Sequence, residues 1–531
     1  MAAQRWRGGA PAHLRSRLGR TLAATIVVLA GAMAVGQQRV AAAANAGNRS
    51  GPAAPGPWDW PSYGHDAQHS FHGRTTITEA QAKTLRQAWF FPTGDAVTAS
   101  PTVVDGTVYV GSWDTRFYAI SLSTGRLRWQ FQLSQQHGVK PFPGEISRPV
   151  DSDGGLVTSS AWYEPAQGTR PPLVIFGGGY TLYALNANTG QLFWRHDYTG
   201  RPDAASDPDH DNARIFSSPV VVDNRVLFGL SVDGQSNERG YVVAASLETG
   251  DPVWIDNTDV NAAGHILNNG CGNIWSSGSV IPNPGLVVFS EADCNFSNPP
   301  PDAETVFALR ISNGRVVWRY RPTRPDPDCD YDFGGSANVG LRSNGTAKFL
   351  GLGSKDGTYY SLDPRTGRRR WATNVVFGGF SGGFIATTAY DGTRVYGSTA
   401  FGDFGRFESN GPKLCDPSNP RDTQFENPSV HAFDARTGKV RWQASLAYSV
   451  SPTTVAGGMT FNGLALKSLV QVRDAATGRL LTSLPSGSPS WSGIATVGDA
   501  LVFGTGTSSL GSPAGVEVFT PKGKPPVVPR S

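Results

Sequence analysis

The stretch YSLDPRTGRRRW, residues 360–371, decides the fold, because the chain repeats its pattern five more times. In every copy a Gly lies four residues before a Trp, and a small residue (Ala, or Ser361) lies six residues before that Gly. The other copies end at Trp129, Trp194, Trp254, Trp318 and Trp442. A weaker seventh copy, VQVRDAATGRLLT, carries Thr482 in place of the Trp. Self-similarity of this kind indicates a repeat architecture and not a row of unrelated domains.

A second phrase precedes most of these copies and predicts a β-hairpin. SPTVVDGTVYVGS (100–112) has two β-branched runs on either side of Asp-Gly, a typical hairpin signal. The same form recurs at 218–231, 277–291 and 492–506. Together with the strands on either side of the Thr-Gly turn, each unit therefore has four antiparallel strands. Helical periodicity is nearly absent, apart from a capping box in TEAQ (78–81).

Four-stranded units repeated around an axis form a β-propeller, which protects its sheet edges by radial packing. The seven copies define seven blades. Residues 488–521 supply three further strands, and LRQAWFF (85–91) supplies a lone strand with its own Trp89. We therefore predict an all-β, eight-bladed propeller whose last blade is closed by an N-terminal strand. The repeated Trp is predicted to pack between blades, because its large apolar face fills the space between sheets.

The two ends of the chain differ in composition from the repeats. Residues 1–46 carry six Arg and no acid, then an apolar run and the small residues VAAAANA, a pattern typical of a secretory signal peptide. A Gly/Pro-rich linker is expected at 47–57, the propeller at 58–521 and a Pro/Lys-rich tail at 522–531. We expect a secreted or periplasmic protein, with no later segment apolar and long enough to span a membrane.

Charge and cysteine content limit the partners and cofactors that the chain can have. Removal of the six Arg leaves 40 basic against 42 acidic residues, about −2 net, so nothing indicates a nucleic-acid partner. Four cysteines in an oxidising compartment predict two disulfides, with three pairings possible. We favour Cys271–Cys294 and Cys329–Cys415. No CxxCH occurs, which excludes a covalently attached c-type haem in this chain.

The long insertions are predicted to share one face of the propeller. They lie at 132–170, 198–214, 258–273, 322–334 and 402–428. The first four connect the fourth strand of a blade to the first strand of the next, and the last connects second and third strands. In antiparallel blades these two connection types emerge on the same face, opposite the Thr-Gly turns. Because functional loops are commonly carried by a rigid scaffold, we expect the site there.

Several polar and aromatic side chains on that face are candidate site residues. Glu238, Trp275, Asp293 and Lys355 all fall in or beside such connections. The run DPDCDYDFGG places Asp326, Asp328, Asp330 and Asp332 at alternate positions, so an extended chain points them to one side. A hard cation such as Ca²⁺ would relieve their repulsion. The alternatives are a solvated acidic loop and, for Lys355, a solvated lysine. Packing is the simpler reading of His65, His69 and His72, although three nearby His could also suggest a metal.

The chain as a whole resembles the quinoprotein alcohol dehydrogenases, eight-bladed propellers that bind pyrroloquinoline quinone (PQQ). The resemblance is carried by WPSYGHDAQHSFHG, ITEAQAKTLRQAWFFPTG and SPTVVDGTVYVGSWDTRFYAISLSTGRLRW, and covers residues 58–521. The YGHD opening and the single propeller look most like polyvinyl alcohol dehydrogenases. The implied function is extracytoplasmic oxidation of an alcohol, of a bulky or polymeric kind given the long loops, with electrons passed to a separate acceptor such as a cytochrome.

The resemblance also implies roles for individual residues. Trp275 would form one wall of the PQQ site, and Lys355, in KDGTYYSLD, would contact the quinone as both a cofactor-binding and a catalytic residue. Glu238 would belong to the cofactor-binding site as well. Glu238, in NERGYVVAASLETG, and Asp293, in SEAD where relatives have GTGN, would bind Ca²⁺. Asp330, in CDYDFGG, would be the catalytic base and a further metal ligand, with Cys329 replacing the Trp of relatives. No two cysteines are adjacent, so the vicinal pair of many relatives is absent.

Two other functions fit the same repeats. PQQ-type propellers also include assembly factors that bind proteins and no quinone, so a non-catalytic protein- or ligand-binding scaffold is the alternative. A carbohydrate-binding or carbohydrate-cleaving propeller is a third, with carboxylates available but none specifically paired.

Overall fold

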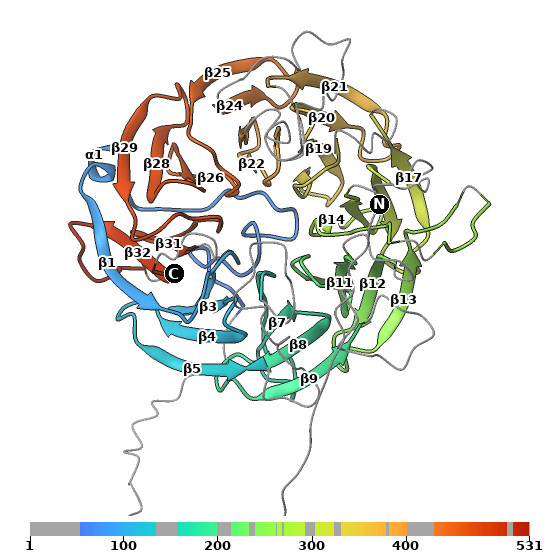
Figure 1. Ribbon diagram of the computed structural model, residues 1–531, viewed down its shortest axis with the longest axis horizontal. Helices are drawn as coiled ribbons and strands as arrows, with labels where there is room; N and C mark the ends of the chain where they lie inside the picture. The colour runs from blue at the N-terminus through green and yellow to red at the C-terminus, as the bar shows by residue number, and fades with distance from the viewer. Residues whose placement is uncertain are drawn as a thin grey trace, which may run out of the picture. The chain divides into compact units, whose positions relative to one another are not determined.

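The computed structural model describes residues 54–133, 157–198, 214–232, 239–261, 263–267, 270–292, 303–322, 331–376, 378, 382–400, 429–506 and 513–529. These residues form eight four-stranded antiparallel sheets, which are the predicted blades. Figure 1 shows them arranged as a ring around a central axis. The eight-bladed prediction is confirmed.

The strands follow the repeats in chain order, and the first blade along the chain is β2 (Thr102–Val104), β3 (Thr107–Gly111), β4 (Arg116–Ser121) and β5 (Leu127–Gln132). The second and third are β6 (Trp162–Glu164), β7 (Leu173–Gly178), β8 (Thr181–Asn186), β9 (Leu192–Asp197), and β10 (Val220–Val222), β11 (Arg225–Leu230), β12 (Tyr241–Ser246), β13 (Pro252–Asn257). The fourth and fifth are β14 (Ser279–Ile281), β15 (Leu286–Ser290), β16 (Val306–Arg310), β17 (Val316–Tyr320), and β18 (Asn338–Leu341), β19 (Ala347–Gly353), β20 (Thr358–Leu362), β21 (Arg369–Asn374). The sixth and seventh are β22 (Ala389–Tyr390), β23 (Arg394–Ser398), β24 (Ser429–Asp434), β25 (Val440–Ser445), and β26 (Thr454–Ala456), β27 (Met459–Gly463), β28 (Leu469–Asp474), β29 (Leu480–Pro485).

The eighth blade joins the two ends of the repeat region. It consists of β30 (Ala495–Val497), β31 (Ala500–Thr505), β32 (Gly515–Pro521) and β1 (Leu85–Pro92). β1 pairs antiparallel with β32 from Leu85 opposite Pro521 to Pro92 opposite Gly515. In Figure 1 blue β1 lies beside red β32, so the N-terminal strand closes the ring as predicted.

Each repeated Trp docks on the next blade, which confirms its predicted packing role. Trp318 illustrates the contact: its Nε1 donates to the Pro364 carbonyl at 3.1 Å, and its ring lies against Gly367. A Cβ on Gly367 would come within 2.5 Å of the indole, so only Gly fits beneath the ring. The same Nε1–carbonyl bond is made by Trp89, Trp129, Trp194, Trp254, Trp371 and Trp442. The Gly–Trp spacing is therefore the sequence signature of the blade interface.

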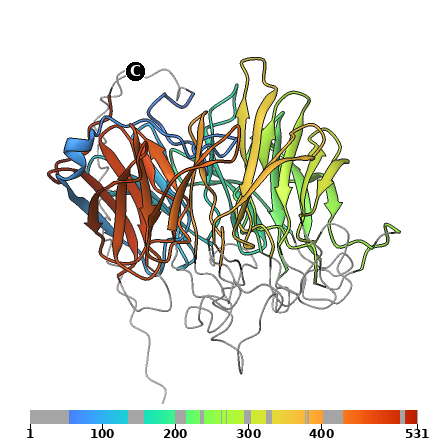
Figure 2. The same ribbon diagram turned by 90° about the horizontal axis from the view of Figure 1, so that it is seen from above.

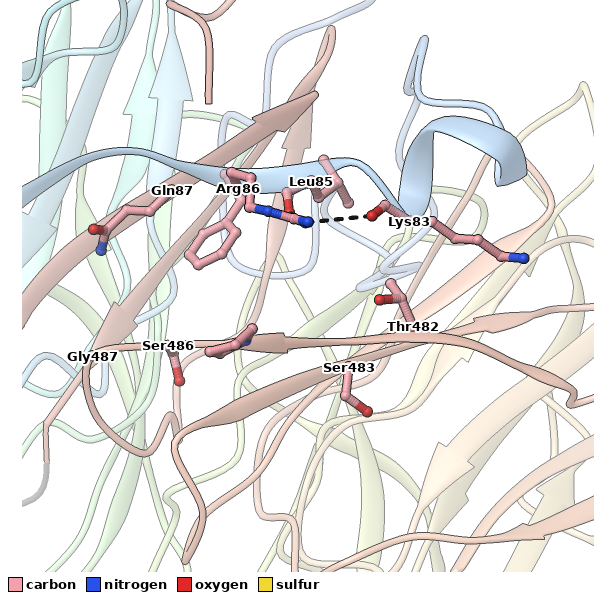
Figure 3. A pocket seen from close by; sticks show the side chains of 10 residues that line it. Lys83, Leu85, Arg86, Gln87, Thr482, Ser483, Ser486 and Gly487 are labelled. Atoms are coloured by element: carbon pink, nitrogen blue, oxygen red, sulfur yellow. Dashed lines mark hydrogen bonds between the residues drawn. The ribbon is translucent and has the colours of Figure 1, made fainter. Parts of the chain in front are cut away.

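The junction that lacks its Trp has a surface groove. Thr482 lies on β29, which faces β1 of the eighth blade, and between them is a groove of about 630 Å³. Figure 3 shows Lys83, Arg86 and Gln87 on one side of it and Thr482 and Ser483 on the other. The groove marks the place where the chain departs from its own repeat, on the outer rim of the ring.

An N-terminal segment crosses the inner strands and ties blades together. We call residues 60–73 the clasp. Its Ala67, Gln68, Ser70 and Phe71 carbonyls accept hydrogen bonds from inner-strand residues of the fourth, fifth, sixth and seventh blades (Val280, Val339, Tyr390 and Val455), at 2.8–3.0 Å. Figure 1 shows this blue segment running across the centre of the ring. The clasp therefore links the inner strands of four blades through its main chain.

The sole helix among the described residues is α1 (Glu79–Ala82), which carries the predicted capping box between Thr78 and Gln81. With four residues it is far too short to cross a membrane, and no described helix qualifies. In Figure 2, which shows the blades edge-on, blue α1 lies near one face of the propeller.

Candidate functional site

The predicted site residues divide into two groups. Trp275 precedes β14, and Lys355 lies in the turn between β19 and β20, so both are described by the structure. Glu238, Asp293 and Asp330 lie outside the described residues. The strand bounds confirm the connection types: a fourth-to-first connection carries Trp275, and a second-to-third turn carries Lys355. Two separate blades thus bring these residues to one face of the propeller.

The structure places Lys355 against Trp275. The Lys355 Nζ lies 5.2 Å from the centroid of the Trp275 ring, a cation–π distance. Lys355 is 6% exposed, whereas Trp275 is half-buried. Lys355 is therefore a buried ammonium over an aromatic face, and not the solvated lysine that was the alternative expectation from the sequence.

A third residue, Asp332, completes this cluster. Lys355 Nζ donates to Asp332 Oδ2 at 3.1 Å and lies 3.0 Å from Oδ1. Asp332 is 1% exposed, so the carboxylate and ammonium form a buried ion pair. Such a pair is costly to desolvate and adds little net stability in general, so a buried pair in a loop is a candidate functional feature.

Two hydrogen bonds to main-chain carbonyls, one from an amide and one from a hydroxyl, hold the two loops together. The Lys355 N–H donates to the Asp332 carbonyl at 2.9 Å, and the Ser354 hydroxyl donates to the Tyr331 carbonyl at 3.0 Å. The side-chain ion pair is therefore set by the backbone and does not depend on two flexible side chains meeting by chance.

A row of buried hydroxyl residues just before the first strands links six consecutive blades, and we call it the girdle. In five of its six residues the N–H donates to the hydroxyl of the next blade's girdle residue: Ser100 to Ser160, Ser160 to Ser218, Ser218 to Ser277, Ser277 to Ser336, and Ser336 to Thr387. These bonds are 2.8–3.0 Å long and buried. Trp275 lies two residues before Ser277 and Asp332 four before Ser336, so both site residues lie close in sequence to the girdle.

Packing explains His69, one of the three histidines of the clasp. His69 is buried, and its Nδ1 lies 3.0 Å from the Ser279 hydroxyl. Burial lowers the pKa of His69 to about 4, against a weaker opposing effect of Asp66. Among the described residues, no group of three or more His, Cys, Asp or Glu side chains could hold a metal ion.

Cys271 is buried and disulfide-bonded. Cys294, Cys329 and Cys415 lie outside the described residues, so the pairing of the four cysteines stays a prediction.

Comparison with known proteins identifies the class. The family model described as "Glucose/ethanol/alcohol dehydrogenase, beta-propeller domain" matches residues 60–375, and the chain belongs to this family. A second model, described as "Outer membrane protein assembly factor BamB", matches residues 355–524.

Individual relatives are distant. The quinoprotein alcohol dehydrogenase PedH of Pseudomonas putida is 22% identical over 486 residues, 80% of this chain and 74% of that protein. A polyvinylalcohol dehydrogenase of Pseudomonas sp is 23% identical over 370 residues, 64% of this chain and 55% of the relative. The chain thus spans only about half the length of the second relative.

Solved structures agree on the fold. The quinohemoprotein alcohol dehydrogenase ADHIIG of Pseudomonas putida HK5 superposes with a TM-score of 0.68 at 18% identity, covering 90% of this chain and 82% of the other. A europium-containing methanol dehydrogenase gives 0.65 at 19% identity, covering 88% and 98%. BamB of Moraxella catarrhalis gives 0.51 at 14% identity, covering 82% and 99%. At these identities the likeness concerns the propeller alone.

Proposed function

We propose that the chain is an extracytoplasmic PQQ-dependent dehydrogenase that oxidises an alcohol and passes electrons to a separate acceptor. The observation that supports this most is the buried Lys355–Asp332 pair against Trp275, at the face where two connection types of the blades converge. The family to which the chain belongs, and relatives named as quinoprotein alcohol dehydrogenases, support the same reaction class.

The described residues fit the chemistry of PQQ, a planar quinone that carries several carboxylates. A planar ring needs an aromatic face, which Trp275 offers. Anionic and carbonyl oxygens need donors, and Lys355 is a buried cation beside that face. The Trp275 Nε1 is buried and makes no hydrogen bond in the described part of the chain, so a donor is available for a ligand acceptor. Trp275 and Lys355 are therefore the residues proposed to hold PQQ.

Each described residue has a proposed chemical role. When bound, PQQ supplies a two-electron acceptor. Asp332 is the carboxylate that accepts the substrate hydroxyl proton, because Lys355 and the main chain hold it in place beside Trp275. Lys355 provides a fixed positive charge next to the reacting groups. We assign the base to Asp332 in preference to Asp330, because Asp332 is the carboxylate held against Lys355.

Calcium remains part of the proposal on the strength of the family resemblance. Glu238, Asp293 and Asp330 are the predicted ligands, and Ca²⁺ prefers six to eight oxygen ligands of this kind. In such a site the ion would act as a Lewis acid.

Substrate, location and acceptor are proposed at a coarser level. The long connections on the site face, and a relative named polyvinylalcohol dehydrogenase, support a bulky or polymeric alcohol. The basic and apolar pattern of residues 1–46 supports export. A cytochrome or another external carrier is proposed to take the electrons, which relatives named as quinohemoprotein alcohol dehydrogenases support.

A titration of the purified protein with PQQ and Ca²⁺ tests the function. Tryptophan fluorescence reports binding, and dye reduction reports turnover with small alcohols and with polyvinyl alcohol. We expect saturable binding, and a loss of turnover of 10²–10⁴-fold in Asp332→Asn with binding retained. Asp330→Asn is the matched comparison: an equal loss in Asp330→Asn alone would move the base to Asp330.

The second candidate is a non-catalytic scaffold, which the match of residues 355–524 to an assembly-factor model favours. It predicts no binding at micromolar PQQ and no effect of Asp332→Asn on partner binding. Absence of PQQ binding in the titration would therefore support the scaffold over the dehydrogenase.

A further inference from the structure

The turn that carries Lys355 is built on a set of side-chain hydrogen bonds, here called the frame, that recurs in a second turn of the described residues. Residues 354–360 read SKDGTYY, and residues 112–118, at the same place in the first blade, read SWDTRFY. In both turns the Asp carboxylate accepts the hydroxyl of the Tyr four residues later. It also accepts the N–H two residues later, at 2.7 Å for Asp356 and 3.0 Å for Asp114. The Asp N–H in turn donates to the Ser hydroxyl, at 3.1 and 3.2 Å.

The two turns differ in the residue that they present. In the first blade it is Trp113, whose Nε1 donates to the Thr98 hydroxyl at 2.9 Å and whose ring packs with Ala96. In the fifth blade it is Lys355, which reaches Asp332 and Trp275. The same frame therefore presents a packing side chain in one blade and a charged site residue in the other.

The backbone around Lys355 has little freedom. A Cβ at Gly378 would lie 2.1 Å from the Lys355 carbonyl oxygen, and one at Gly383 would lie 2.4 Å from it. The Phe384 N–H donates to the Ser354 carbonyl at 3.0 Å. These contacts restrict the movement of the turn at residues 354 and 355. On the other side the Tyr360–Asp356 bond closes it, and burial raises the pKa of Asp356, as expected for a carboxylate held inside the frame.

We propose that Asp356 and Tyr360 are positioning residues, which hold the Lys355 ammonium between Asp332 and the Trp275 ring by closing this turn. Neither residue needs to touch the substrate or cofactor. The consequence for cofactor binding rests on the proposed function, whereas the placement of Lys355 does not.

Matched substitutions in the two blades test the inference. Tyr360→Phe removes only the hydroxyl that Asp356 accepts, and Asp356→Ala removes the whole frame. Tyr118→Phe and Asp114→Ala are the same changes in the first blade. Asp114 also accepts the Gly94 N–H at 2.7 Å, so the control loses at least as many hydrogen bonds. Asp356→Asn, which keeps an acceptor for the Thr358 N–H, is the conservative variant expected to recover part of the effect.

The first readout needs no cofactor. Acetylation of lysines in the unliganded protein, followed residue by residue by mass spectrometry, reports the accessibility of the Lys355 amine. We expect slow labelling in the wild type, at least tenfold faster labelling of Lys355 in Tyr360→Phe and Asp356→Ala, and less than twofold change in the two controls. The second readout is PQQ affinity by tryptophan fluorescence, which we expect to fall about tenfold only in the fifth-blade variants.

Circular dichroism and thermal melts establish whether each variant is folded. If Asp356→Ala does not fold, Tyr360→Phe, the mildest change, still provides the test. Equal effects in both blades, or unchanged Lys355 labelling in Tyr360→Phe, would overturn the inference. If the wild type binds no PQQ, the proposed function fails, but labelling of Lys355 still decides whether the frame positions it.

Discussion

At the scale of single residues, the Lys355–Asp332 pair is an arrangement in which each charge depends on the other. Replacement of Lys355 by Met leaves the Asp332 carboxylate 1% exposed without its ammonium partner. Because a buried carboxylate that loses its ammonium partner costs several kcal/mol, we expect the free energy of unfolding to fall by about 3–5 kcal/mol. Denaturant unfolding at pH 7 measures it.

The double variant Lys355→Met with Asp332→Asn is the control for that result. Loss of both charges removes the desolvation penalty, so at least half of the lost stability is expected to return. A double variant as unstable as Lys355→Met alone would show that the cost lies in packing against Trp275 and not in charge.

His69 makes stability depend on pH. Its pKa is about 4 in the folded protein, below the ordinary 6.5, because burial disfavours the charged ring. The unfolded chain therefore binds the proton more tightly, and the contribution of neutral His69 is complete above pH 6.5 and lost as pH falls from 6.5 to 4.

For a shift of this size the loss is on the order of 3 kcal/mol. We expect His69→Gln to flatten the fall in unfolding midpoint between pH 7 and pH 4.5, with buried His431, whose pKa is also about 4, accounting for part of what remains. A variant with the wild-type pH dependence would contradict this.

At the scale of the elements, the docking Trp should dominate the stability of each blade interface. Trp318 is 7% exposed and is anchored by its bond to the Pro364 carbonyl. Trp318→Ala is expected to lower the free energy of unfolding by about 3–5 kcal/mol, the usual cost of this truncation in a core. Thr482→Ala, at the equivalent position of the seventh blade, is the control, and we expect a change within about 0.5 kcal/mol. Comparable losses in the two variants would mean that the repeat position itself, and not the indole, carries the stability.

These elements are largely predictable from the sequence because the determinants of a blade are local. The Gly four residues before each Trp forms the turn and also the surface on which the Trp of the preceding blade docks. Both partners of an interface therefore belong to the same short repeated motif. Closure by residues 85–91 also follows, because Trp89 belongs to the same pattern and the last repeat lacks a fourth strand. Trp275 and Lys355 could be proposed as neighbours because the connection types determine the face.

Asp332 could not be selected in this way. It appeared in the sequence only as one of four alternating carboxylates, and the family motif indicated its neighbour Asp330 as the base. What distinguishes it is a contact between two loops, the bonds from residues 354 and 355 to residues 331 and 332, which no periodicity reports. The sequence feature that could identify Asp332 is its position four residues before the girdle residue Ser336. That feature has a meaning only after the structure has shown the girdle.

At the scale of the whole molecule, the N-terminal clasp connects four consecutive blades that lie far from it in sequence. Asp66 shapes it: Oδ1 accepts the N–H groups of Gln68 and Ser70, at 3.0 and 3.1 Å. These residues and their neighbours in turn accept the amides of Val280, Val339, Tyr390 and Val455, so one carboxylate supports contacts to four blades.

Asp66→Ala should therefore release these four amides together. Native-state hydrogen exchange is expected to show faster exchange at all four positions, because their four acceptor carbonyls all lie in the segment 67–71 that Asp66 holds in shape. The girdle amides of Ser160, Ser218 and Ser277 are the internal control, since their acceptors are hydroxyls of adjacent blades. If the girdle amides accelerated equally, the clasp would be holding the ring itself closed. If the four amides exchanged at separate rates, each blade would keep its inner strand without help from the clasp. Faster exchange confined to the four amides would make the clasp a segment that orders the inner strands on a ring already closed by β1 and β32.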